Sequence, residues 1–406
     1  MKINQILAAI AASAMLPATM MLSGATAGEL LTATADITMK AAYISAGVPY
    51  ESSTIEAALS LHTAEATAEA PIIEQDEPVF PTTQPVITQT SESVEPAIEE
   101  DNEPETTEAI PEDTLPRARV ISQNITPADD GLDYTAAGTQ SGAIFRRHYS
   151  GSESAEYITL ASGAQVRNCT YDSNDALLAA AQELPDLEIE LYSSEPQVLI
   201  IHTHTTESYE PYIRAYYDAD FPSRSCDPAH NMIAVGEVLA QTLADNGISV
   251  LHDGTLHDYP AYTGSYDRSE ETIRAILSQY PSIKVVIDLH RDAMAEGDGS
   301  RIAPTAIING RNAAQFMIIS GCDDGTFNMP HYMENFKLAA LLQNMSEAMH
   351  PSLARPVLFD YRNYNQHITT GSLLIEIGSH ANALEEALYT AELLGESMAA
   401  ALAVLS

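Results

Sequence analysis

Three short apolar runs, each followed at once by histidine and carboxylate side chains, constrain the fold of this chain most strongly. The runs occupy residues 198–201, 285–287 and 373–375. Their length and composition predict buried strands, and parallel strands bring their carboxyl ends to one edge of a sheet. The polar residues that follow are His202, His204 and Glu207, then Asp288, His290 and Asp292, and finally Glu376 and His380. The pattern predicts one polar site built from three strand ends.

The second half of the chain alternates between strand and helix patterns. Apolar spacing predicts helices at about 231–246, 269–279, 332–349 and 384–405, with further strands near 248–251, 304–308 and 316–320. Ser269 is expected to cap the second of these helices. We therefore predict an α/β fold with a mostly parallel sheet flanked by helices.

The preceding residues divide into three further segments. Residues 1–27 combine a Lys, an apolar stretch and a small-residue end, which predicts a signal peptide or a membrane anchor and an extracytoplasmic location. Residues 28–116 predict a disordered acidic linker rich in Pro, Thr and Glu. Residues 117–195 predict an accessory β-rich element that is packed on the main domain or continuous with it, with strands at 155–160 and 187–192 and a short helix at 175–184. The catalytic domain is expected over 196–406.

Composition excludes some classes of function. The 406 residues include 57 Asp and Glu but only 18 Lys and Arg, for a formal net charge of −39. Nucleic-acid binding requires clustered cations, so we expect no nucleic-acid partner. The three cysteines, Cys169, Cys226 and Cys322, are far apart and predict neither a disulfide framework nor a cysteine zinc site.

The residue types at the three strand ends predict a metal site. Residues i and i+2 of an extended strand face the same side, so His202 and His204 are both expected to face the site, together with His290. Glu376 interrupts an apolar strand, where a carboxylate is costly unless it is paired or lies near a metal. A single histidine is more often structural, but histidines and a carboxylate occurring together favour hydrolytic zinc.

Four motifs in one order closely resemble the stage II sporulation protein P family. They are Val-Leu-Ile-Ile-His-Thr-His-Thr-Thr-Glu-Ser-Tyr-Glu-Pro from residue 198, the stretch from His252 through His257-Asp-Tyr-Pro-Ala-Tyr to Ser269, Val-Ile-Asp-Leu-His-Arg-Asp-Ala from residue 286, and Leu-Leu-Ile-Glu-Ile-Gly-Ser-His-Ala-Asn from residue 373. The resemblance covers about residues 195–404. That family is similar to zinc-dependent N-acetylmuramoyl-L-alanine amidases, which hydrolyse peptidoglycan.

The resemblance implies roles for individual residues. His204 or His202 matches the first metal ligand, His290 the second histidine ligand, and Glu376 the catalytic base. Such amidases carry a glutamate ligand before the helix at 231–246, but this chain has Asp227 and His230 there, so Glu207 is the preferred third ligand and the other two stay open. Arg291 either stabilises charge during catalysis or pairs with Asp292, the second being favoured. The loop side chains His252, His257, Tyr259 and Tyr262 either line a substrate groove or pack internally.

The resemblance also implies a setting. It implies cleavage of the amide between N-acetylmuramic acid and L-alanine during engulfment in sporulation, and cutting of glycan strands as a second activity. It implies peptidoglycan, a second hydrolase (stage II sporulation protein D) and a membrane protein as partners. The alternatives are a noncatalytic cell-wall binding module that keeps the fold, and a different metallohydrolase. Deacetylases usually combine an early Asp-Asp pair with a His-x-x-x-His helix, and no His-x-x-x-His spacing occurs in the sequence.

Overall fold

The computed structural model describes residues 118–135 and 138–406. The predicted signal peptide or membrane anchor at 1–27 and the predicted acidic linker at 28–116 lie outside the described residues. Within the described part, no helix combines the length and the apolar composition that crossing a bilayer requires.

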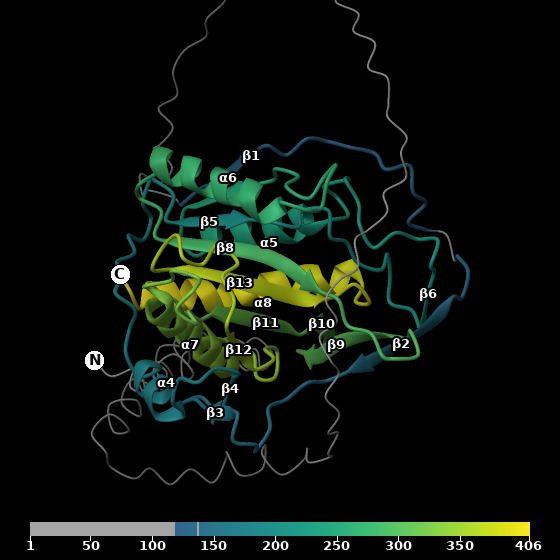
Figure 1. Cartoon of the computed structure of the whole chain (residues 1–406). Helices are drawn as coiled ribbons and strands as arrows, with labels where there is room; N and C mark the ends of the chain where they lie inside the picture. Colours follow the sequence, from purple (N-terminus) through teal and green to yellow (C-terminus); the bar gives the residue numbers. More distant parts are fainter. Residues whose placement is uncertain (1–117, 136–137) are drawn as a thin grey trace, which may run out of the picture.

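A nine-stranded sheet forms the centre of the molecule (Figure 1). In spatial order its strands are β1 (Val120–Gln123), β7 (Val250–Asp253), β5 (Val198–Ile201), β8 (Val285–Asp292), β13 (Ser372–Ser379), β11 (Phe316–Gly321), β12 (Val357–Asp360), β4 (Gln165–Asn168) and β3 (Tyr157–Thr159). All neighbours pair in parallel except β11 with β13 and β3 with β4. The predicted mostly parallel sheet flanked by helices is confirmed.

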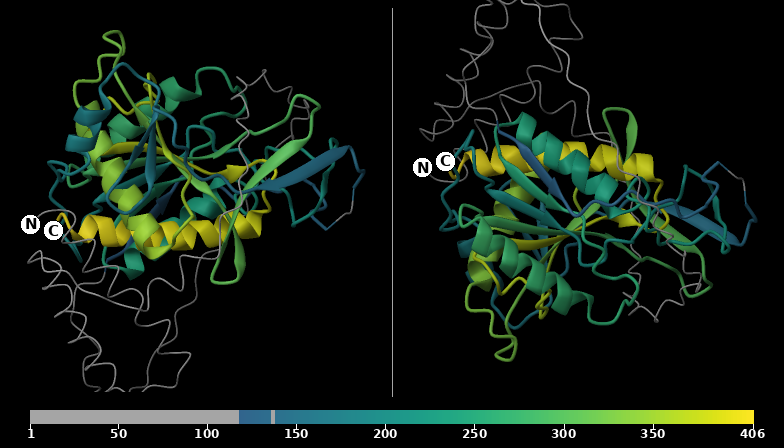
Figure 2. Two further views of the ribbon diagram at one scale, coloured as in Figure 1. Left: turned by 90° about the horizontal axis from the view of Figure 1, so that it is seen from below. Right: turned by 90° about the horizontal axis from the view of Figure 1, so that it is seen from above.

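Helices cover both faces of this sheet. On one face, α8 (Leu384–Ala403) packs against α5 (Met232–Asp245) and α7 (Tyr332–Met349), and these three helices share the largest apolar core. The long α8 runs along the sheet in both views of Figure 2. On the other face lies α6 (Ser265–Gln279). The short α4 (Asn174–Ala180) contacts α7.

Packing on both faces of β5 explains why all four of its residues are apolar. Val198 and Ile200 belong to the core beneath α5 and α8, whereas Leu199 and Ile201 pack with the buried isoleucines of α6. A strand with helices on both faces has no solvent side, so all of its residues are apolar. This two-sided packing accounts for the continuous run seen in the sequence.

A second sheet of four strands lies beyond the carboxyl ends of β8 and β13 and extends away from the main body (Figure 1). Its strands are β10 (Arg311–Ala314), β9 (Arg301–Ile308), β2 (Gly142–Arg147) and β6 (Tyr216–Tyr217). The β2–β9 pair is parallel and the other two pairs are antiparallel.

The elements expected from the sequence mostly form, with two corrections. The helix expected from Ser269 begins instead at Ser265, after Gly264 in a left-handed conformation, and the Ser269 hydroxyl bonds to Thr203 rather than capping the helix. Residues 187–192 are irregular, not a strand. The segment 117–195 supplies β1, β3 and β4 to the main sheet, so it is continuous with the strands of 196–406.

Candidate active site

The register of β8 and β13 places Glu376 directly beside His290. The two strands are parallel, and these two residues are Cα partners in the ladder. On β8, Asp288 and His290 follow Val286 at intervals of two, and Val286 packs on the α6 side of the sheet. On β13, Glu376 likewise follows Leu374 at an interval of two. Leu374 does not belong to the core that α5, α7 and α8 share, so it lies on the opposite face of the sheet from α8. Two adjacent strands thus present three titratable side chains on one face.

His290 lies between two carboxylates. Its Nδ1 is 3.5 Å from Glu207 Oε2, and its Nε2 is 2.8 Å from Asp288 Oδ1. All three side chains are buried. The pKa of His290 is raised well above its usual value, because the two carboxylates outweigh the opposing effect of burial. This environment favours a positive charge at His290.

Glu207 is held as an anion by several cationic groups. Its carboxylate accepts a hydrogen bond of 3.2 Å from the backbone N–H of Arg291 and lies 3.7 Å from the Arg291 guanidinium and 3.6 Å from that of Arg224. Burial raises the pKa of Glu207, but Arg291, His290 and Arg224 together lower it below its usual value. Glu207 therefore supplies a permanent negative charge at the site.

His204 completes this cluster. Its ring lies 5.2 Å from the ring of His290, at 90°, and stacks on Tyr262 at 4.5 Å. Nε2 is 3.1 Å from the Tyr262 hydroxyl, and Nδ1 is 3.4 Å from the Ser265 hydroxyl. Burial lowers the pKa of His204 to about 3, so the imidazole is neutral at pH 7 and keeps a lone pair.

His202 does not face the same site as His204, which corrects the expectation drawn from strand periodicity. The strand ends at Ile201 and residues 203–206 form a turn, so the two histidines diverge. His202 Nδ1 donates to the Leu289 carbonyl at 2.9 Å, and its Nε2 meets His252 Nε2 at 2.9 Å. Both nitrogens are thus engaged within the protein. Of the two candidates for the first ligand, His204 is the one that lies beside His290.

Glu376 has the environment of a proton acceptor. Its side chain is partly exposed, yet Oε2 is buried and has no hydrogen-bond partner among the described residues. Burial, together with the Asp292 carboxylate, raises the pKa of Glu376 to about 8. Asp292 itself pairs with Arg355 at 2.9 Å. A cation bound nearby would lower the pKa of Glu376 again.

A bulge in β13 follows Glu376. The pairing of β13 with β8 shifts register between Glu376 and Ser379. Gly378 has a φ of +62°, and a Cβ there would lie 2.7 Å from the Ala314 Cβ and 2.7 Å from Asn382 Oδ1. Bulges of this kind redirect side chains near functional sites. The glycine lets the strand pass Ala314 while Glu376 stays on the site face.

Arg291 does not pair with the Asp292 carboxylate, contrary to the favoured expectation. Its Nε donates to the Ser208 carbonyl at 3.2 Å and its Nη2 to the Ser223 carbonyl at 2.9 Å. The side chain is buried and faces Glu207. This geometry suits holding Glu207 in place and compensating its charge.

The two open alternatives for the third ligand contact other residues. Asp227 and His230 lie 3.9 Å apart, and the His230 ring stacks on Tyr134 at 3.4 Å. Glu207, by contrast, contacts His290. The structure therefore brings Glu207, not the other two, together with His204 and His290.

The expected groove loop is partly a packed element. His252 and His257 are fully buried, and His257 Nδ1 donates to the His202 carbonyl at 2.8 Å. Of the two alternatives for His252 and His257, the structure shows internal packing, because both side chains are buried and form hydrogen bonds with His202. Tyr262 reaches the site by stacking on His204, and Tyr259 is 45% exposed.

Several supporting contacts carried no clear signal in the sequence. Asp288 accepts from the Thr203 backbone N–H at 2.8 Å and so connects the first motif to His290. Asp258 pairs with Arg224 at 2.7 Å, which positions that arginine near Glu207. The spacing of two between Asp288 and His290 could have indicated a shared face, but the roles of Arg224 and Arg355 depend on contacts far apart in the chain.

The side chains of this site carry nitrogen and oxygen atoms of the kind that bind a divalent cation. No three His, Cys, Asp or Glu side chains of the described residues converge closely enough to hold a metal ion as they stand. His204, Glu207 and His290 nevertheless provide a neutral imidazole, an anion and a second imidazole in contact. The carboxylates that raise the pKa of His290 make this part of the site favourable for positive charge. These are the nitrogen and oxygen donors that zinc accepts.

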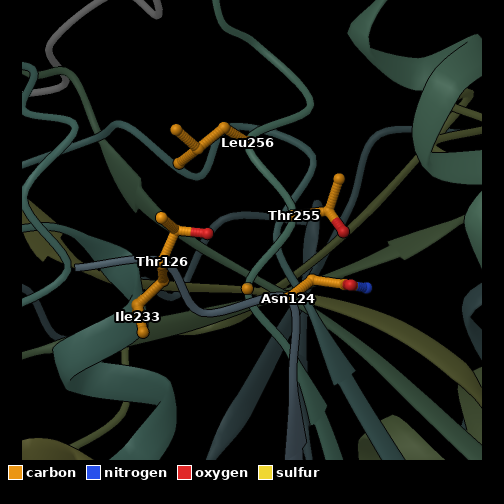
Figure 3. A pocket seen from close by; sticks show the side chains of 6 residues that line it. Asn124, Thr126, Ile233, Thr255 and Leu256 are labelled. Atoms are coloured by element: carbon orange, nitrogen blue, oxygen red, sulfur yellow. The ribbon is translucent and has the colours of Figure 1, made fainter. Parts of the chain in front are cut away.

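Two cavities in the described part of the chain differ in their relation to this site. One, of about 270 Å³, is lined by Asn124, Thr126, Ile233, Gly254, Thr255 and Leu256 (Figure 3). None of these side chains is an acid or a base, so this cavity offers no catalytic group. The other, of about 370 Å³, includes Tyr266, whose ring edge meets His204 at 5.5 Å. The second cavity therefore adjoins the candidate active site.

Fold and site define an α/β protein with a histidine–carboxylate site at the carboxyl ends of its sheet. The family model for Stage II sporulation protein P matches residues 68–399. The chain belongs to this family. Stage II sporulation protein P of Bacillus subtilis (strain 168) is 31% identical over 202 residues, which cover 47% of this chain and 47% of that protein. The match thus spans about half the length of the curated relative.

Two solved structures show a weaker similarity. N-acetylmuramoyl-L-alanine amidase AmiC2 of Nostoc punctiforme matches at 12% identity and a TM-score of 0.31, covering 52% of this chain and 98% of that chain. The apo form of the N-acetylmuramyl-L-alanine amidase Ami1 from Mycobacterium abscessus matches at 9% identity and a TM-score of 0.31, covering 52% and 99%. TM-scores this low carry no argument about this chain.

Proposed function

We propose that this protein is a zinc-dependent peptidoglycan hydrolase that cleaves the amide between N-acetylmuramic acid and L-alanine during sporulation. Membership of the Stage II sporulation protein P family supports the cell-wall setting. The observation that carries the chemistry is the pairing of Glu376 with His290 across β13 and β8, beside Glu207 and His204.

In this proposal His204, Glu207 and His290 hold the zinc ion. Bound there, zinc would polarise the amide carbonyl and make a water molecule more acidic. To reach the ion, His204 gives up its contact with Tyr262 or with Ser265. Asp288 keeps the ring of His290 in orientation from the other side, as carboxylates commonly do for histidine ligands.

Glu376 acts as the general base. Its unbonded Oε2 takes the proton from the attacking water and then delivers it to the amine of the leaving L-alanine. Arg291 and Arg224 keep Glu207 ionised, so that the charge of the ligand set is balanced. Proton uptake from water and proton delivery to the amine both use the Glu376 carboxylate. The fold holds this carboxylate beside His290, and Oε2 has no competing hydrogen bond among the described residues.

The proposed setting is the extracytoplasmic face of the cell membrane, with the chain anchored or secreted. Peptidoglycan would be the substrate, and stage II sporulation protein D and a membrane protein would be partners in engulfment. Cutting of glycan strands belongs to the same proposal as a second activity. The competing function is a noncatalytic cell-wall binding module that keeps the fold.

Digestion of purified peptidoglycan with the zinc-loaded chain tests the proposal. We expect free stem peptides with a new L-alanine amine, and a loss of about 100- to 10,000-fold in their release rate for Glu376→Gln, since the amide cannot act as a base. Glu385→Gln, an exposed position in the first turn of α8, is the matched control and should keep the full rate. Peptidoglycan binding without release of any peptide by the unaltered chain would favour the noncatalytic module.

A further inference from the structure

The cavity next to the candidate active site has aromatic walls and one arginine. It measures about 370 Å³, and its lining includes Tyr266, Phe327, Tyr361, Arg362 and Tyr364. Four aromatic rings at one cavity are notable in a chain with only 6% aromatic residues. Aromatic faces with a few polar groups are the usual composition of binding sites for organic ligands.

A chain of ring contacts connects this cavity to the catalytic cluster. The His204 ring meets the edge of Tyr266 at 5.5 Å, and Tyr266 stacks on Tyr364 at 5.3 Å. Tyr364 in turn accepts a hydrogen bond of 2.6 Å from Arg362 Nη1. Tyr266 thus contacts His204 and also lines the cavity, so one side chain is common to the catalytic cluster and the cavity.

Arg362 can accept an anion. Its Nε donates to Asp360 at 2.9 Å and its Nη1 to Tyr364, whereas Nη2 has no protein partner in the described part of the chain. The side chain is 29% exposed. A guanidinium recognises carboxylates through its planar fork of donors. Asp360 neutralises part of this charge and so competes with an incoming anion.

The loop that carries Arg362 and Tyr364 is held rigidly. Tyr364 has a φ of +43° and Asn365 a φ of +58°, and a left-handed conformation is uncommon for a bulky side chain such as tyrosine. Asn365 Nδ2 donates to the Tyr266 carbonyl at 2.9 Å and to the Ser269 hydroxyl at 3.0 Å. Unfavourable backbone conformations of this kind persist where surrounding contacts fix them, often at ligand sites.

We propose that this cavity is the subsite for the stem peptide of the substrate, with Arg362 binding a peptide carboxylate and Tyr266 and Tyr364 packing against the peptide chain. The inference rests on the proposed function and extends it, because it assigns the peptide side of the scissile amide to a defined surface. In an acidic chain with 18 Lys and Arg in total, an arginine at this cavity favours a carboxylate-bearing ligand over a neutral one.

Binding measured by calorimetry tests the subsite without requiring catalysis. The probes are a soluble disaccharide–tetrapeptide and the same muropeptide with its peptide carboxylates amidated, and the Glu376→Gln chain serves as the parent to prevent turnover. We expect Arg362→Gln to weaken binding of the acidic probe by about tenfold and to leave the amidated probe unaffected. Asp360→Asn removes the competing carboxylate and should tighten binding of the acidic probe several-fold.

Arg311→Gln is the matched control. The Arg311 guanidinium lies over the ring of Tyr389 at 3.8 Å, and Arg311 is on strand β10 of the four-stranded sheet, away from the cavity. It should bind both probes like the parent. Arg362→Lys, which keeps the charge, should recover part of the affinity and guards against a folding defect in Arg362→Gln. Equal weakening of both probes by Arg362→Gln, unchanged binding of the acidic probe, or no binding of it by the parent would each overturn the subsite.

The two proposals fail in different ways. A chain that binds the acidic probe through Arg362 but releases no stem peptide from peptidoglycan contradicts the hydrolase and leaves the subsite standing. A chain that releases stem peptide but whose affinity is independent of Arg362 contradicts the subsite alone.

Discussion

His202 and His204 are close in the chain but have different chemical environments. His202 donates from Nδ1 to a backbone carbonyl, so its Nε2 lone pair accepts from His252, and the pair is fully buried. The ring nitrogens of His204 contact the hydroxyl groups of Tyr262 and Ser265, and either nitrogen can leave its hydroxyl to bind a ligand. One histidine therefore supports the fold, and the other is available for a ligand.

Substitution of each histidine by glutamine should separate these roles. His202→Gln breaks buried hydrogen bonds and should cost about 1–3 kcal/mol, or about 2–4 °C in melting temperature for each kcal/mol, while zinc is retained. His204→Gln should lose most of the zinc with a smaller change in melting temperature. Metal analysis and thermal denaturation check both outcomes, with His230→Gln as a control that changes neither by much. Full zinc retention by His204→Gln would remove this residue from the ligand set.

At the level of elements, α5 approaches the sheet closely because it carries a glycine at the contact. A Cβ on Gly236 would lie 2.5 Å from His252 Nε2 and 2.8 Å from the His202 ring. Asn231 caps the helix through a bond to the Ile233 N–H, and the helix ends at Asp245 with Asn246 as its C-cap. The cap and the glycine together fix the helix over the two bonded histidine rings.

Gly236→Ala should destabilise the protein in spite of its higher helix propensity. Alanine favours a helix by about 1 kcal/mol over glycine, but overpacking a core typically costs about 1–3 kcal/mol. The rings that the new methyl would meet are buried and hydrogen-bonded, so overpacking should prevail and lower the melting temperature by a few degrees. Gly297→Ala is the control, because no atom lies within 4 Å of its Cβ position. A melting temperature of Gly236→Ala equal to or above that of the unaltered chain would contradict this argument.

At the level of the whole molecule, both edges of the main sheet come from the segment before residue 196. β1 pairs with β7 at one edge, and β4 and β3 complete the other edge beyond β12. Ile158, Val166 and Leu177 of this segment belong to the largest core. Folding therefore joins residues 118–195 and 196–406 in one hydrophobic core.

Two truncations test this integration. A chain that begins at residue 118 keeps all nine strands and should unfold cooperatively near the temperature of the full chain. A chain that begins at residue 196 exposes the unpaired edges of β7 and β12, which favours aggregation, and should be insoluble or unfold at a much lower temperature. Circular dichroism and size-exclusion chromatography measure the difference. Equal stability of the two truncations would show that 118–195 is an independent addition.

Sequence alone determined the elements whose signals are local. The run at β5 and the helices α5 and α7 follow from apolar composition and apolar period along the chain. The apolar runs also placed His290 and Glu376 on two strands of the predicted sheet. They did not define where the strands stop, because β8 continues to Asp292 and β13 to Ser379.

Tertiary structure alone decided which of these side chains meet. Pairing between distant segments places β11 antiparallel to β13 and adds β1 at one end of the sheet and β4 with β3 at the other. It also puts His290 and Glu376 on one face. A local pattern does not encode such pairing. The turn at residues 203–206 made the expectation that His202 and His204 face the same side wrong, since the spacing of two holds only while the chain stays extended. Contacts with distant residues such as His252 gave His202 its structural role.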